Sequence, residues 1–106
     1  MATSNNFSFF QGEDHVRPFI ANPAQDITGW TIEFKIYEQY NGTVIFTKTI
    51  GSGIVIIDAT SGQLTVTIYR ADNISLSKAM YYYELRRSDT NHNTLLSYGD
   101  MRILKG

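Results

Sequence analysis

The sequence predicts a single all-β domain built as a sandwich or barrel of short strands. Valine, isoleucine and threonine together number 27 and the aromatic residues 14, whereas alanine and leucine together number 12. This excess of β-branched and aromatic residues favours strands over helices. Turn residues separate short apolar stretches about every 8–12 positions, which is typical of sandwiches and barrels. A chain of 106 residues is long enough for one such domain.

The N-terminal residues 1–6 are small and polar, which predicts an arm in front of a domain that spans residues 7–106. Phe7 and Phe9 alternate, so they fall on one strand face, and Phe10 falls on the other. Two hypotheses remain open for this stretch. Either the phenylalanines belong to the first strand of the domain itself, or the arm and Phe10 reach a neighbouring subunit.

Two strands are expected next. The first is a short strand over residues 16–21, at the edge of a sheet, because Pro18 has no N–H group for a central ladder. The second runs from residue 30 to residue 37 and is the clearest in the sequence. Its apolar residues occupy alternate positions, as in a half-buried strand: Trp30, Ile32, Phe34 and Ile36. We expect Trp30 to be fully buried as an anchor of the core.

A hairpin is predicted at Asn41-Gly42, since both residue types accept the positive φ that a tight turn requires. The return strand would run over residues 43–50. A two-residue loop would place Lys35 opposite Lys48, whereas a four-residue loop would place Glu33 opposite Lys48. Opposite charges pair better across strands than like charges, so the longer loop is favoured.

The second half of the chain is expected to supply four more strands. They are placed at residues 54–57, 64–69, 80–87 and 94–104. The first is predicted to be a short buried strand. The second and third alternate, with one face formed by Leu64, Val66 and Ile68 and by Tyr81, Tyr83 and Leu85, respectively. Gly99 interrupts the last of them. A single helical turn is expected near residues 72–79, with Asp72 or Ser75 as its cap. The turn is too short to be stable without the sheet.

The residues that carry chemistry do not form a catalytic or metal-binding pattern. Nine basic residues balance ten acidic ones, which gives no electrostatic signal for nucleic acid or an anionic membrane. The longest apolar run has four residues, at 54–57, against about 20 for a membrane span. Cysteine is absent, and His15 and His92 are expected in exposed loops without a second ligand at metal spacing. The sequence therefore predicts no enzyme, no catalytic residue, no cofactor and no metal.

Aromatic residues are the best candidates for an interface. Several tyrosines fall on the outward positions of the expected strands, where they could stack on a sugar or anchor a protein contact. It is equally open whether loops of the domain cover them instead. The candidate interface residues are Phe7, Phe9, Phe10, Tyr37, Tyr40, Tyr69, Tyr82 and Tyr98.

The order of the motifs along residues 9–104 resembles a known family. These motifs are Gln11-Gly12-Glu13-Asp14, Asp26-Ile27-Thr28-Gly29-Trp30, Asp58 with Gly62, Leu64-Thr65-Val66-Thr67-Ile68, Tyr81-Tyr82-Tyr83-Glu84-Leu85 and Leu95-Leu96-Ser97-Tyr98-Gly99. Together they are similar to the small immunoglobulin-like domains of tailed-bacteriophage virion proteins, such as the N-terminal domain of upper baseplate proteins. The resemblance implies an immunoglobulin-like antiparallel β-sandwich of about seven to eight strands. It supplies no catalytic residue.

The function expected from this resemblance is structural. The chain would be a component of a virion, in the tail, baseplate, neck or head decoration, and would pack against other virion proteins as part of a homo-oligomeric assembly. The alternative is a carbohydrate-binding module that uses exposed tyrosines to adhere to a surface glycan. Coplanar outward rings over a groove would favour the glycan, and a larger flat apolar patch would favour the protein contact.

Overall fold

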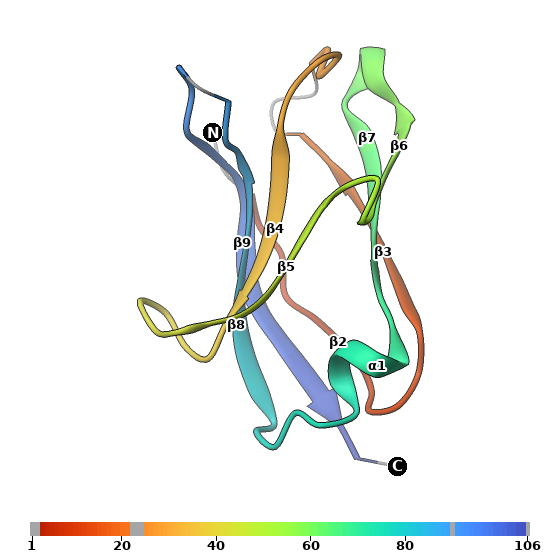
Figure 1. Cartoon of the computed structure of the whole chain (residues 1–106), viewed down its shortest axis with the longest axis vertical. Helices are drawn as coiled ribbons and strands as arrows, with labels where there is room; N and C mark the ends of the chain where they lie inside the picture. The colour runs from red at the N-terminus through yellow and green to blue at the C-terminus, as the bar shows by residue number, and fades with distance from the viewer. Residues whose placement is uncertain (1–2, 22–24, 90, 106) are drawn as a thin grey trace.

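The chain folds as an all-β domain, as the composition predicted. The computed structural model describes residues 3–21, 25–89 and 91–105 (Figure 1). Within these ranges the strands are β1 (Thr3–Ser4), β2 (Phe7–Phe10), β3 (His15–Ile20), β4 (Ile32–Tyr37), β5 (Val44–Ile50), β6 (Gly53–Asp58), β7 (Gln63–Ile68), β8 (Met80–Arg87) and β9 (Thr94–Leu104). Two short helical turns accompany them, the 3-10 turn η1 (Ala59–Ser61) and the helix α1 (Arg70–Asn73).

The strands form one continuous sheet that folds over into two layers. Its order is β1-β9-β8-β4-β5-β6-β7-β3, and β2 also pairs with β9. Figure 1 shows β9, β8 and β4 in one layer and β3, β7 and β6 in the other. The layers join where β5 and β6 pair in parallel at residues 49–50 and 53–54. The pairs of β1 and β2 with β9 are also parallel, so the sheet is mixed rather than purely antiparallel.

The core lies between the two layers and follows the predicted alternation of β4. Ile32, Phe34 and Ile36 are at most 1% exposed. The Phe34 ring lies 5.9 Å from the Phe19 ring of β3 and 5.3 Å from the Tyr83 ring of β8. This contact between strands of opposite layers is the centre of the domain.

Trp30 is not the buried anchor that the alternation predicted. It lies before β4, where its N–H group donates to the carbonyl oxygen of Ile27 (3.1 Å). The ring is half-buried against the core, and the guanidinium carbon of Arg87 lies 4.0 Å from its centroid. The turn from Ile27 to Trp30 comes just before β4, so Trp30 does not share the alternation of the strand. Its indole covers the end of the core instead of filling it.

The N-terminal segment is part of the domain rather than a free arm, as far as it is described. Residues 3–4 form β1 alongside β9, and the Asn5 N–H group donates to the carbonyl oxygen of Tyr98 (2.8 Å). The Tyr83 hydroxyl donates to the Asn5 carbonyl oxygen. A Cβ on Gly99 would lie 2.7 Å from that same oxygen, so the close approach requires glycine there. Met1 and Ala2 lie outside the described residues.

The hairpin after β4 has neither of the two registers considered from the sequence. Lys48 lies opposite Phe34, not opposite Glu33 or Lys35, and Ile36 lies opposite Phe46. A bulge shifts the register between Ile36 and Tyr37. The extra residue of a bulge reverses which side chains face inward, and this turns Lys48 towards the interior.

The helical turn lies earlier than expected. It covers Arg70–Asn73 instead of residues 72–79, because the Asp72 carboxylate accepts a hydrogen bond from the Tyr69 N–H group (2.8 Å) and caps the turn there. Strand β9 runs through Gly99 without a break. Its irregularity is a register shift opposite Leu85 and Arg86, beside Leu96 and Ser97, which are consecutive and both buried.

Candidate interaction surfaces

The structure divides the predicted interface residues among four environments. Phe7 and Phe9 are 8% and 5% exposed and belong to the core, so they cannot form an interface. Phe10, on the opposite face of β2, is 47% exposed, as its alternation predicted. Tyr69 is exposed just before α1. The remaining four tyrosines lie in or beside β4, β8 and β9.

Three of these tyrosines form a cluster on the outer face of the β4–β8 layer. We call Tyr37, Tyr40 and Tyr82 the tyrosine cluster. Tyr37 lies directly opposite Tyr82 in the ladder, with the ring centroids 5.9 Å apart and the rings tilted by 45°. The Tyr40 ring meets the Tyr82 ring edge-on at 5.3 Å. Tyr98 lies further along, opposite Glu84 in the β8–β9 ladder.

Glu84 holds the cluster together. Its carboxylate accepts hydrogen bonds from the Tyr82 hydroxyl (2.9 Å), the Tyr37 hydroxyl (3.4 Å) and Arg86 Nε (2.8 Å). Burial alone would raise the pKa of Glu84, but the hydrogen bonds from Arg86 and Tyr82 lower it below the usual value. Burial and the bond to Glu84 raise the pKa of Tyr82. At neutral pH the Tyr82 phenol is therefore protonated and the Glu84 carboxyl group is charged.

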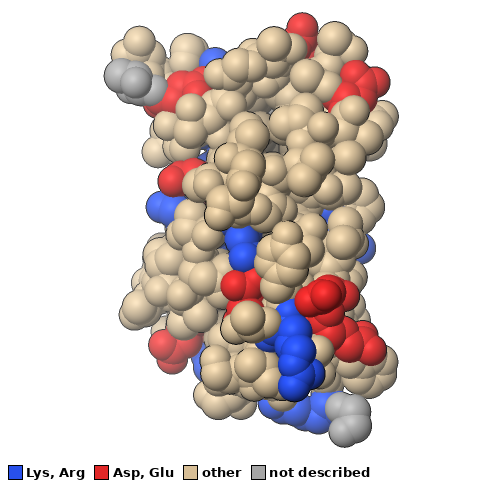
Figure 2. Space-filling model, turned by 45° about the vertical axis from the view of Figure 1, so that its right-hand side comes forward, with Lys and Arg blue, Asp and Glu red and all other residues tan. Residues whose placement is uncertain are grey.

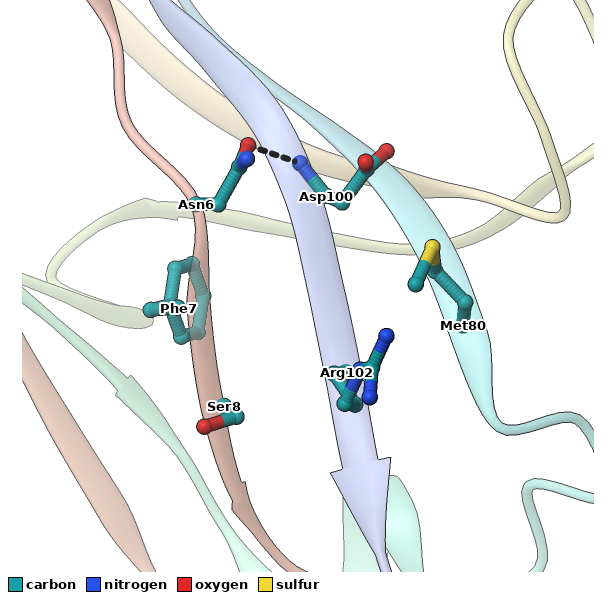
Figure 3. A pocket seen from close by; sticks show the side chains of 6 residues that line it. All are labelled: Asn6, Phe7, Ser8, Met80, Asp100 and Arg102. Carbon is teal, nitrogen blue, oxygen red and sulfur yellow. Dashed lines mark hydrogen bonds between the residues drawn. The ribbon is translucent and has the colours of Figure 1, made fainter.

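Shallow hollows surround the cluster. One of about 340 Å³ is lined by Lys35, Tyr37, Asn41, Tyr82, Glu84, Arg86 and Asn93. A second, of about 320 Å³, lies beside Tyr40 and Met80. A third, of about 310 Å³, lies between β2, β9 and β8 (Figure 3). In this third hollow the Asn6 side chain accepts a hydrogen bond from the Asp100 N–H group (2.9 Å), so its polar lining serves to hold β2 against β9.

The opposite outer face of the domain is mostly apolar, and the charged residue among the outward positions of its three strands is Asp58, at the end of β6. We call it the β3–β7–β6 face. Four of its side chains are large, apolar and 54–60% exposed: Val16, Ile20, Val55 and Ile57. Pro18, Asp58, Gln63, Thr65 and Thr67 complete it, and the ladders pair Val16 with Thr67, Val55 with Thr65 and Asp58 with Gln63. Figure 2 views this side obliquely, with charged atoms gathered in the lower half and further acidic side chains at the upper end.

Sequence reasoning missed this face because it took residues 54–57 as a short buried strand, whereas Val55 and Ile57 are 54% and 60% exposed. The inward position between Val16 and Pro18 is held by Arg17, which donates to the Asn5 side-chain oxygen (2.7 Å) and lies 5.1 Å from the centroid of the Phe7 ring. The stem of an arginine can cover apolar surface while its head is hydrogen-bonded. An arginine flanked by valine and proline is the signal that was available.

His15 is not the exposed loop residue that was expected. It begins β3 and is half-buried, with its ring stacked 4.9 Å from the Phe9 ring and 5.5 Å from the Phe7 ring. Its Nε2 atom is buried and has no hydrogen-bond partner among the described residues. Burial and the nearby Arg17 lower its pKa, while Glu13 partly opposes them. His92 is exposed, as expected.

We expect the domain to lose stability as the pH falls through the titration range of His15. The pKa of His15 in the folded protein is below the usual histidine value of 6.5, so the unfolded chain takes up the proton first and is favoured at lower pH. The loss should begin near pH 6.5 and end below the folded pKa. Urea midpoints at pH 7, 6 and 5 measure it. His15→Phe should flatten this part of the profile and His92→Phe should not, and equal slopes in all three proteins would contradict the assignment.

Searches for a metal site, a membrane span and a related protein add no further candidate to these surfaces. Among the described residues, no three His, Asp or Glu side chains lie close enough together to hold a metal ion. No helix in the described part of the chain has the length and hydropathy to cross a bilayer. No family model matches the chain, and no curated protein matches it.

Proposed function

We propose that this chain is a non-enzymatic structural protein of a tailed-phage virion and acts as a protein–protein assembly module. The observation that supports this most is the β3–β7–β6 face, with four large apolar side chains more than half exposed and Asp58 as its charged residue. The centre of a protein contact is depleted in charged residues relative to the remaining surface. The virion setting is taken from the family resemblance of the sequence.

The tyrosine cluster fits the alternative, glycan binding, less well. A sugar ring stacks on a flat aromatic face, and coplanar rings would provide a platform for it. Here the rings are tilted by 45° and 90° to one another, and two of the three hydroxyls donate to Glu84. The cluster therefore acts as a packed, hydrogen-bonded patch of the sheet surface.

The same cluster gives no support to an enzyme. A general acid or base works best with a pKa near the operating pH. The pKa of Glu84 is lowered, and those of Tyr37 and Tyr82 are raised, so each moves away from neutrality. This favours a role in holding the sheet surface rather than in proton transfer.

The proposal is tested on particles. Particles produced by the genome that encodes this chain would be purified on a density gradient, and their proteins quantified by mass spectrometry. We expect the chain in a fixed number of copies per particle, retained in high salt because apolar contacts are not screened. A chain found only in the soluble fraction would overturn the proposal.

A variant locates the contact on the chain. Val55→Lys places a charge on the β3–β7–β6 face and should remove the chain from particles, because a contact would bury that charge without a partner. Thr47→Lys is the matched control, since Thr47 is an exposed β-branched residue on β5 outside this face. Equal incorporation of both variants would exclude this face from the assembly.

A further inference from the structure

We propose that the domain opens in acid between the two ends of its sheet, where protonation of His15 releases residues 3–10. The continuous sheet ends at β3 on one side and at β1 and β2 on the other. No backbone ladder joins these two edges among the described residues, so side chains alone close the sheet there. We call this junction between β2 and β3 the seam. It belongs to the fold and would open in acid whether or not the chain is part of a virion.

Two side chains of β3 make the contacts across the seam. The His15 ring stacks on the Phe9 ring at 4.9 Å and on the Phe7 ring at 5.5 Å, with interplanar angles of 7° and 13°. Arg17 donates to the Asn5 side-chain oxygen (2.7 Å), and its guanidinium carbon lies 5.1 Å from the centroid of the Phe7 ring. Because Phe7 and Phe9 are buried, these contacts close the core on the side of the N-terminal segment.

The closed seam leaves polar atoms without partners. His15 Nε2 and Arg17 Nε are both buried and have no hydrogen-bond partner among the described residues. In the neutral imidazole one of the two nitrogens carries no hydrogen, whereas in the cation both are donors. Protonation of His15 would therefore place a second charged donor beside the Arg17 guanidinium, with no acceptor for it. In the open form both groups reach water.

The charged groups around His15 do not supply that acceptor. Arg17 lies two residues along the strand and opposes protonation. Glu13 favours protonation, but its side chain is exposed in the turn before β3. The Asp14 carboxylate is turned to α1, where it accepts a backbone hydrogen bond (2.7 Å). The neighbouring strands present phenyl rings from β2 and Ile68 from β7, and neither provides a carboxylate.

The phenyl rings offset only part of this cost. An aromatic face attracts a cation, but the Phe7 ring already has the Arg17 guanidinium near it, and a second cation there is repelled by the first. The N–H groups of an imidazole point outward in the plane of its ring. Rings stacked above or below that plane cannot accept hydrogen bonds from them.

Residues 3–10 are the part that protonation releases, because they are attached to the sheet along one edge only. Strands β1 and β2 pair with β9 and with no other described strand (Figure 3). The other attachments of the segment to β8 and β9 are single hydrogen bonds of Asn5 and Asn6. Opening exposes the edge of β9 together with the Phe7 and Phe9 rings. The ladders of β8 with β9 and with β4 remain in place.

Native-state hydrogen exchange at single residues tests the opening, since it detects a minor open form. The reporters are the Asn5 N–H group, which donates to Tyr98, and the Asp100 N–H group, which donates to Asn6. After correction for the intrinsic exchange rate, their protection should fall by up to tenfold per pH unit between pH 6.5 and the pKa of His15 in the folded protein. Their protection should also be lower than that of the β4 amides and nearly independent of low urea concentrations, because a local opening exposes little surface.

Two substitutions assign the effect to His15. His15→Phe keeps an aromatic ring in the stack and should make the protection of the reporters independent of pH. His92→Phe is the matched control, in the exposed loop before β9, and should leave the pH dependence unchanged. Glu13→Gln removes the carboxylate that favours the proton, so it should lower the pKa of His15 further and extend the fall to lower pH. The NMR signal of the imidazole Cε1 hydrogen measures this pKa.

Two results would overturn the opening of the seam. If the reporters exchange with the same protection and the same urea dependence as the β4 amides, the segment is released by global unfolding alone. A fall in protection that persists in His15→Phe, or that is unchanged in Glu13→Gln, would show that another group is responsible. Because Glu13 is exposed, its variant keeps the test decisive even where His15→Phe lowers the stability of the domain.

Discussion

Phe34→Ala should destabilise the domain by about 3–5 kcal/mol, since it removes a fully buried aromatic ring and leaves a cavity between the layers. Phe34 is 0% exposed and packs against Phe19 and Tyr83. Urea unfolding measures the loss. Phe10→Ala is the matched control, because Phe10 is 47% exposed and should lose less than about 1 kcal/mol. Similar losses for the two variants would contradict the placement of the core.

The success of the sequence prediction around Phe34 has a simple cause. Strand β4 lies inside the sheet between β5 and β8 and has one face on the core, so its apolar residues must alternate. The same holds for β7 and β8, whose inward positions were assigned correctly. Where one face of a strand is exposed to solvent and the other is buried, the two-residue periodicity of apolar side chains is enough to predict which residues are buried.

The prediction failed where a single extra residue or a distant contact decides the outcome. The bulge between Ile36 and Tyr37 changes the register of β5, and the residue pattern of the hairpin does not reveal it. Residues 1–6 were expected to form an arm. In the structure β1 and β2 instead pair with β9, which joins the two ends of the chain. Parallel pairing between such distant segments leaves no local pattern in the sequence.

Asn73 shows the same limit for a polar residue. It is fully buried, and its side-chain amide donates to the carbonyl oxygens of Glu13 and Tyr69 while its oxygen accepts from the Gly12 N–H group. Gln11 donates to three carbonyl oxygens at the end of α1 and in the segment just after it. These bonds fix the loop before β3 against α1. Since buried polar groups need partners, such a residue is recognised only once the partners are known.

The candidate surfaces could be predicted only in part. The outward tyrosines of β4 and β8 were identified because they alternate with core residues on strands whose faces were assigned correctly. The β3–β7–β6 face was not identified, since Arg17 replaces an apolar residue at an inward position and Val16 and Ile20 face outward. An apolar residue on a strand is assigned to the core by default, and only the fold reveals that two layers leave a second apolar face outside.

The second prediction with a large expected effect concerns Lys48, the side chain that the bulge turns inward. Lys48 is 9% exposed and lies beside the Phe46 and Tyr69 rings, with its Nζ 5.5 and 5.0 Å from their centroids. A Cβ on Gly53 would approach its side chain to 2.5 Å, so β6 closes over it. The partner of its ammonium group is the Asp72 carboxylate, at 2.5 Å. This ion pair links β5 to α1.

Asp72→Ala should therefore destabilise the domain by about 3 kcal/mol, because it leaves the buried ammonium group without a partner and removes the cap from the Tyr69 N–H group. The double variant Lys48→Met with Asp72→Ala should recover part of this loss, since no unpaired charge is then buried and methionine fills a similar volume. Denaturant unfolding of the single and double variants gives the coupling between the two side chains. If the two losses simply add, the pair contributes no coupling, and Asp72 acts through its cap on α1 alone.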